Sequence, residues 1–233
     1  MRLRSCGMGD LLLSEELLLI GLHDETGKAD GWFDPSCLHG ALVCDLIEGG
    51  AVTVDEKKKL HPAGRAPEHP ALRKVYDVIA ADGKPRTVSH WVSTLPWKHT
   101  KPAELVAERL VDNGVLSREE GKVLGLFRTT RLPALDPAPE RALRERLRGI
   151  LVTGIEPGAH DALLITLLHS TSQVKAALAG VDPAQRKIGT KRAATIAKGL
   201  KDNPVVKAQY DAAMVALVTT VATTAVVTSS GSG

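Results

Sequence analysis

Apolar side chains are so dense in two stretches of the chain that each stretch predicts a helix buried on all sides. The segment Leu17 to Leu22 follows Ser14, which suits the N-cap of a helix, and Glu15 and Glu16, which suit its first turn. The second stretch, Ala162 to Leu168, is almost wholly apolar. Because a helix without a polar face packs inside a core, both segments are predicted to be central helices.

Elsewhere, apolar positions recur every three to four residues, which is the spacing of a helix with one buried face. One such helix is predicted from Ser36 to Glu48, and two glycines follow it. Its buried face consists of Leu38, Ala41, Leu42 and Leu46. Similar spacing predicts further helices over Leu72–Ile79, over Val88–Leu95, from Pro102 over Ala103–Leu110, from near Pro139, from Asp182-Pro183 and from Pro204.

Two segments show strand-like patterns instead. Ala51 to Val54 alternates, and the following residues can reverse the chain, which predicts a hairpin over Val52 to Leu60. Val123 to Phe127 is a second strand candidate, within a hairpin over Val123 to Leu132. The sequence therefore predicts a mainly α fold, a single compact helical domain with buried central helices and two or more β-hairpins.

Composition agrees with a helical core. Of 233 residues, 43% are apolar but only 3% are aromatic, so the core must depend on aliphatic side chains, which favours helices over a β-sandwich. No long linker divides the chain. We predict one domain over residues 11–227, preceded by an N-terminal extension (1–10) and followed by a flexible tail (228–233).

Several features favour a cytoplasmic location. The three cysteines are odd in number and lack metal-type spacing, which indicates a reducing compartment. The first apolar run is interrupted by polar residues and lacks a signal cleavage site. The apolar segment Ala212 to Val227 is shorter than the about 20 residues that span a bilayer, and we predict that it forms a packed terminal helix.

Signatures of the common catalytic sites are missing from the sequence. It contains no G-x-S-x-G, H-E-x-x-H, P-loop or complete G-x-G-x-x-G motif. His61 and His69 flank Glu68 in a proline-rich loop, but no regular structure fixes them as metal ligands. We therefore predict that the protein is not an enzyme and uses no metal or other cofactor.

Basic side chains form three groups. Lys57 to Lys59 lie at the tip of the first predicted hairpin, and Arg141, Arg144 and Arg148 form a stripe on one predicted helix. Lys98 and Lys101 precede a predicted helix start, where free backbone N–H groups favour an anion. The net charge of +3 is too small to indicate nucleic acid by itself, whereas the groups favour a surface that contacts phosphates.

Several stretches of the chain follow one another in an order that is typical of a known family. The first are Leu11 to Asp24 (LLLSEELLLIGLHD), followed by Gly27 and Trp32, and then Leu38-His39-Gly40. They resemble the opening helix and the Leu-Arg-Gly helix of the Golgi phosphoprotein 3 family. The resemblance continues in LVDNGVL (110–116), GLF (125–127), TTRLP (129–133) and GTKRAATIAKG (189–199), and in a terminal apolar helix. It spans roughly residues 11 to 227.

The resemblance implies a non-catalytic peripheral membrane protein that binds phosphatidylinositol 4-phosphate. Trp32 matches a tryptophan of the family's lipid pocket, and His39 stands at the arginine of its Leu-Arg-Gly stretch. Lys98 and Lys101 stand near its two remaining basic positions. We expect these four residues to converge on one exposed face and to bind an anionic membrane lipid, more tightly when His39 is protonated. A homo-oligomer is also compatible with the sequence.

A DNA-binding winged-helix regulator is the alternative reading. A helix, a glycine turn and a two-stranded wing are predicted in Ser36 to Leu60 and again in Ala103 to Leu132, and such modules place a helix in the major groove. The candidate recognition helix, Leu38 to Leu46, carries His39 and Asp45 but no Arg, Asn or Gln to contact bases. The sequence therefore favours lipid over nucleic acid as the partner.

Overall fold

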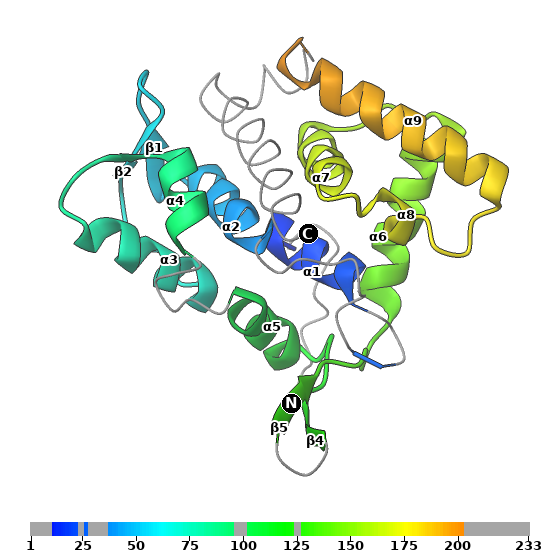
Figure 1. The fold of residues 1–233 in the computed structure, drawn as a ribbon, viewed down its shortest axis with the longest axis horizontal. Helices are drawn as coiled ribbons and strands as arrows, with labels where there is room; N and C mark the ends of the chain where they lie inside the picture. Colours follow the sequence, from blue (N-terminus) through cyan, green and yellow to red (C-terminus); the bar gives the residue numbers. More distant parts are fainter. Residues whose placement is uncertain (1–10, 23–25, 28–36, 96–101, 124–126, 203–233) are drawn as a thin grey trace.

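The computed structural model describes residues 11–22, 26–27, 37–95, 102–123 and 127–202 (Figure 1). Helices predominate among them, and the strands form two small antiparallel sheets. The mainly α fold is thus confirmed. The predictions for residues 1–10, for the helix from Pro204, for the segment Ala212 to Val227 and for the tail lie outside the described residues.

The first half of the chain combines helices with a three-stranded sheet. Strand β2 pairs with β1, where Val54 lies opposite Leu60, and also with β3. The predicted first hairpin is confirmed, whereas the third strand is too short to show a pattern in the sequence. The elements are α1 (Leu13–Gly21), α2 (Cys37–Glu48), β1 (Val52–Val54), β2 (Lys59–Pro62), α3 (Pro70–Ala81), β3 (Arg86–Thr87), α4 (Val88–Thr94) and α5 (Pro102–Asp112).

The second half begins with a hairpin and continues as helices. Of the prolines predicted to lie at helix starts, Pro102 and Pro183 are the first residues of their helices and Pro139 is the second residue of its helix. Asp182 caps the longest helix, since its Oδ1 accepts the N–H of Ala184 at 2.9 Å. The elements are β4 (Glu119–Val123), β5 (Phe127–Arg131), α6 (Ala138–Arg148), the π-helical turn η2 (Gly149–Thr153), α7 (Ala159–Ser170), α8 (Val174–Ala177), α9 (Pro183–Gly199) and the 3₁₀ turn η3 (Leu200–Asp202).

Helix α1 lies at the centre of the fold (Figure 1). All of its residues are buried, and it packs against α2, α5, α6, α7 and α8. A helix that is apolar nearly all round can bury every face only if neighbours surround it. The predicted burial of Leu17 to Leu22, and that of Leu163 to Leu168 in α7, is confirmed.

The start of α1 differs from the prediction. The helix begins at Leu13, so Ser14 lies inside it and is not its N-cap. The cap comes from α2 instead: the carboxylate of Asp45 accepts the N–H groups of Leu13 at 2.9 Å and of Ser14 at 3.1 Å. A short-range pattern could not show this cap, because Asp45 is 31 and 32 residues away from its partners.

The second hairpin is also displaced. Val123 to Phe127 is not one strand, because Val123 ends β4, Phe127 begins β5, and the two residues are paired across the hairpin. The sequence of β4 is EEGKV, which is too polar to display the alternation expected of a half-buried strand. The sequence of β4 therefore gives no strand signal before Val123, and the hairpin begins earlier than the pattern predicts.

Gly27 joins the segment after α1 to the end of the second hairpin. Its carbonyl oxygen accepts the N–H of Leu132 at 2.9 Å. Its φ is +57°, and a Cβ atom at this position would lie 2.1 Å from the backbone nitrogen of Pro133. Only glycine fits a left-handed backbone in such close contact.

The core forms one continuous cluster from Leu13 to Leu200, made chiefly of Leu, Ile, Val and Ala, with Trp91 as its large aromatic member. It includes residues of both halves of the chain, as expected for a single domain. No helix in the described ranges combines the length and the hydropathy needed to cross a bilayer.

Candidate functional site

Three buried carboxylates lie at the N-terminal half of α1: those of Glu15 and Glu16, which belong to this helix, and that of Asp45 from α2. Glu15 is fully buried and is contacted by the Arg109 guanidinium of α5 at 2.9 Å and by Nε2 of His69 at 3.4 Å. The Leu12 N–H also donates to this carboxylate, at 2.9 Å. A buried charge is tolerated when it is paired and hydrogen-bonded, and Glu15 meets both conditions.

Glu16 is paired in the same way on the other side of α1. Its two carboxylate oxygens contact Nη2 of Arg146 at 2.6 Å and Nε2 of His160 at 2.9 Å. His160 also approaches Glu48 at 3.6 Å. Burial alone would lower the pKa of His160, but the hydrogen bonds and charges of the two glutamates outweigh burial and raise that pKa to about 10.

The pKa of Asp45, which caps α1, is raised by its surroundings. Burial raises its pKa to about 7, although the hydrogen bonds from Ser14 and Leu13 act in the opposite direction. None of Glu15, Glu16 and Asp45 lines the surface hollows described next. We therefore assign this buried charge network a structural role, which is to join α1 to the helices around it.

A second concentration of charge lies on the surface, along α9. This helix contains no acidic residue. Arg192 is held by the end of η2, where its Nη2 contacts Glu156 at 3.1 Å and the carbonyl oxygens of residues 154 and 155 at 3.2 and 3.3 Å. The basic residues of α9 are Arg186, Lys187, Lys191, Arg192 and Lys198.

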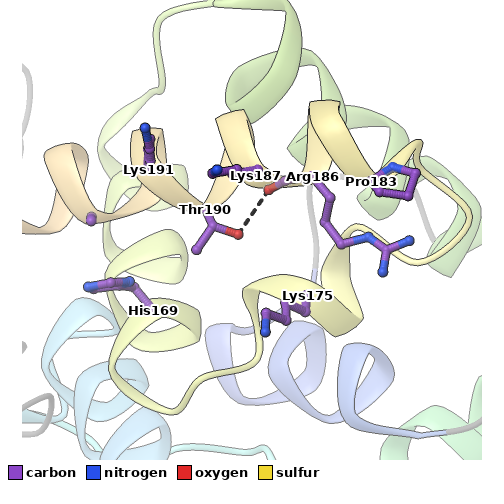
Figure 2. Close-up of a pocket in the computed structure, with 8 residues that line it drawn as sticks. His169, Lys175, Pro183, Arg186, Lys187, Thr190 and Lys191 are labelled. Atoms are coloured by element: carbon purple, nitrogen blue, oxygen red, sulfur yellow. Dashed lines mark hydrogen bonds between the residues drawn. The ribbon is translucent and has the colours of Figure 1, made fainter.

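Two adjoining hollows lie between α9 and the α7–α8 region, with volumes of ≈ 460 Å³ and ≈ 720 Å³. Figure 2 shows Thr190 pointing from α9 toward α8, with His169 of α7 to one side and Arg186 to the other. The Lys191 side chain projects to the opposite side of α9 in the same view. Among the described residues that line either hollow, none is acidic. His169, Lys175, Arg186 and Thr190 line both.

Local contacts fix the geometry of these hollows. Nη2 of Arg186 donates to the Val181 carbonyl at 2.9 Å, which holds the guanidinium beside the turn before α9. The Thr190 hydroxyl donates to the Arg186 carbonyl at 2.9 Å, so its oxygen can still accept a hydrogen bond. Gly189 permits the close approach of α9, since a Cβ there would lie 2.5 Å from the Leu178 side chain.

A family model described as Golgi phosphoprotein 3 (GPP34) matches residues 13–216 of this chain. The chain belongs to the Golgi phosphoprotein 3 family. The match covers most of the chain and includes all of the helices described above, so the resemblance inferred from the sequence is confirmed.

The residues expected to form the lipid site of this family member are only partly described. Trp32, Lys98 and Lys101 lie outside the described residues, so their convergence stays a prediction. His39 lies in the first turn of α2 and is only 3% exposed. The expectation that His39 lies on an exposed face is therefore wrong, because residues 38–46 of α2 are buried throughout.

The same burial bears on the winged-helix alternative. A recognition helix must present side chains to the major groove, but every residue of the candidate helix Leu38 to Leu46 is buried. This helix cannot contact DNA without leaving the core. The buried face predicted for it, by contrast, is confirmed.

The other basic groups are divided between turns and ion pairs. Lys57 and Lys58 are exposed at the turn between β1 and β2, as predicted, whereas Lys59 is the half-buried first residue of β2. The neighbouring Asp55 and Glu56 make that turn mixed in charge. In the arginine stripe of α6, Arg144 is engaged by Glu140 at 2.6 Å. In the described part of the chain, Arg141 and Arg148 form no ion pair, but α6 also carries the acidic Glu140 and Glu145. It is therefore mixed in charge, whereas α9 has no acidic residue.

The α9 surface was missed in the sequence. The net charge of the whole chain is a modest +3, and this total conceals a local excess of positive charge. Counting charge by predicted helix would have found it, since α9 carries five basic residues and no acidic one. The lysine contributed by α8 could not have been placed beside α9 from its sequence position.

Proposed function

We propose that this protein is a non-catalytic peripheral membrane protein that binds anionic, phosphoinositide-type lipid head groups. Membership of the Golgi phosphoprotein 3 family carries the proposal, through the match over residues 13–216. Phosphatidylinositol 4-phosphate is the ligand that the family suggests. In this role the chain would be a cytoplasmic adaptor that associates with the membrane surface.

The proposed head-group site comprises Trp32, His39, Lys98 and Lys101, of which His39 is a buried residue of α2. An indole suits the membrane interface because it combines an apolar body with one N–H donor. Each lysine near an anionic surface contributes about 1 kcal/mol to binding. Residues 28–36 lead into α2 and residues 96–101 lead into α5, and the packing of α2 against α5 supports bringing the two segments together.

Co-sedimentation with liposomes tests this proposal. Vesicles containing phosphatidylinositol 4-phosphate are compared with phosphatidylserine vesicles of equal charge, at low and at physiological salt. Trp32→Ala should weaken binding through lost insertion, and Lys98→Glu with Lys101→Glu should weaken it by at least roughly 30-fold. Salt should weaken wild-type binding, because exposed charges are screened beyond about 8 Å at physiological ionic strength.

Lys84→Glu with Lys198→Glu is the matched control, since both lysines are exposed and lie elsewhere on the described surface. His39→Arg is unsuitable as a gain-of-binding variant, because it would bury a guanidinium beside the core. Wild type that ignores both lipids, or site variants that bind as the control does, would refute the proposed lipid site. A titration with duplex DNA over the same salt series tests the winged-helix alternative, which salt-sensitive binding to DNA would support.

A further inference from the structure

We infer that the hollows between α7, α8 and α9 form a binding site for the phosphate group of a phosphate ester. The site is separate from the residues of the lipid surface proposed above, and the inference does not rest on that surface. It rests on the side chains that line the hollows, on their charge and on their size.

The lining supplies several donors suited to phosphate. Arg186 offers a planar guanidinium, Lys175 and Lys187 offer ammonium groups, and His169 offers a ring nitrogen. Hydrogen bonds between such cations and phosphate oxygens are about twice as strong as neutral ones. Helix α9 presents these groups from one side and the α7–α8 region from the other, so an anion between them can be contacted by both.

The positive charge of this region is poorly compensated by its neighbours. In the described part of the chain, Lys175 and Lys187 form no ion pair, and the one side-chain hydrogen bond of Arg186 goes to a neutral carbonyl, that of Val181. Like charges gathered around a hollow repel one another, at a cost to the folded state. A bound anion between the two sides of the hollow would reduce that repulsion.

Size points to a phosphate ester more than to a bare ion. The smaller hollow, at ≈ 460 Å³, already falls within the about 300–1,000 Å³ of small-molecule sites. Apolar atoms are available beside the cations, for example those of Pro183 and Ala194 in the smaller hollow. A phosphate with an attached polyol or sugar would therefore be accommodated, either as a free metabolite or as the head group of a lipid.

The test uses the whole chain and inositol 1,4-bisphosphate as a soluble probe, titrated by calorimetry at fixed ionic strength. Lys175→Gln with Lys187→Gln should weaken binding by roughly tenfold or more, from the loss of charge-assisted contacts. Both lysines are exposed, so the variant should still fold. Lys84→Gln with Lys198→Gln removes the same charge outside the hollows and should change affinity by less than about twofold.

The titration is repeated in the Lys98→Glu, Lys101→Glu variant, which removes the proposed lipid surface. Probe binding that persists there, but is lost with Lys175 and Lys187, assigns the ligand to the hollows whatever becomes of the lipid proposal. Wild type that does not bind the probe, or equal losses in the hollow and control variants, would overturn the inference.

A vesicle arm then distinguishes the two sources of phosphate. If the hollow variant also loses co-sedimentation with phosphatidylinositol 4-phosphate vesicles, the ligand is a lipid head group. If only soluble binding is lost, the ligand is a free phosphate ester. Both results support a phosphate site between α7, α8 and α9.

Discussion

The charged side chains of helices α1 and α9 differ in their burial and in their ion pairing. Around α1, Glu15 and Glu16 are buried, and each is contacted by one arginine and one histidine. Along α9, basic residues face the surface, and Arg192 alone among them has an acidic partner in the described part of the chain. Charge that is buried and paired fixes the relative positions of helices, whereas charge that is exposed and unpaired is available to a ligand.

The largest effect that this comparison predicts is at Glu16. Glu16→Gln removes the carboxylate that Arg146 and His160 share inside the protein, and should lower the free energy of unfolding by about 3 kcal/mol. The matched control is Glu156→Gln, which removes the 90% exposed partner of Arg192 on α9 and should cost less than about 1 kcal/mol. Urea denaturation of both variants measures the difference, and similar losses would contradict the comparison.

The second prediction concerns the pH dependence of stability. The folded-state pKa of His160 is raised to about 10 from 6.5, so its contribution is complete below about pH 6.5 and is lost as pH rises through about 10. Asp45, with its pKa raised to about 7 from 3.8, loses stability only as pH rises from about 4 to about 7. Burial also raises the pKa of the Cys44 thiol well above its usual 9.0, so the contribution of Cys44 to stability is lost only as pH rises above about 9. The range from pH 7 to about pH 9 therefore separates His160 from both Asp45 and Cys44.

Thermal denaturation across that range should show a falling melting temperature in the wild type. In His160→Gln the decline should be reduced, and the difference between the two curves should shrink toward pH 9, because the stabilising contribution of the charged imidazole decreases as pH approaches its folded-state pKa of about 10. Parallel curves for the two proteins would show that His160 does not carry the charge assigned to it.

A smaller effect is expected where α9 packs on its neighbours. Gly189→Ala places a methyl group 2.5 Å from a Leu178 methyl, and the overpacking should cost about 1 kcal/mol. Gly199→Ala is the control in the same helix, where a Cβ meets nothing within 4 Å, and it should stabilise by up to about 1 kcal/mol through helix propensity. Chemical denaturation that gives both substitutions the same sign would refute the close approach at Gly189.

The smallest effect is predicted for the exposed cations of α9. Lys187→Gln with Lys191→Gln should leave the unfolding free energy within about 0.5 kcal/mol of wild type, because neither side chain is paired in the described structure. A loss comparable to that of Glu16→Gln would show that these lysines have structural partners, and would remove the contrast between α9 and α1.

Patterns within single elements allowed most helices to be predicted. The burial of Leu38, Ala41, Leu42 and Leu46 and the start of α9 at Pro183 both follow from signals a few residues long. The failures involve partners distant in the chain. Glu15 and Glu16 have the pattern of an exposed first turn, and their burial depends on Arg109 and Arg146, which are 94 and 130 residues away.

The candidate site followed the same rule. His39 was expected at the surface because it stands at a family arginine, but the helix that carries it is enclosed by neighbours that its local sequence does not reveal. The hollow beside α9 needs Lys175 and His169 to face Arg186, which depends on how α8 packs against α9. Tertiary packing decides such features, and no short-range pattern encodes it.

The central position of α1 also has a consequence for biosynthesis. This helix is synthesised before the other described elements, yet those that cover it extend to α8, which ends at Ala177. At about 5–20 residues per second, that stretch of chain takes roughly 8–30 s to translate. During this interval the apolar helix α1 is not yet covered, and Glu15 and Glu16 lack their partners Arg109 and Arg146. A nascent chain truncated before α6 should therefore be prone to aggregation and should recruit chaperones.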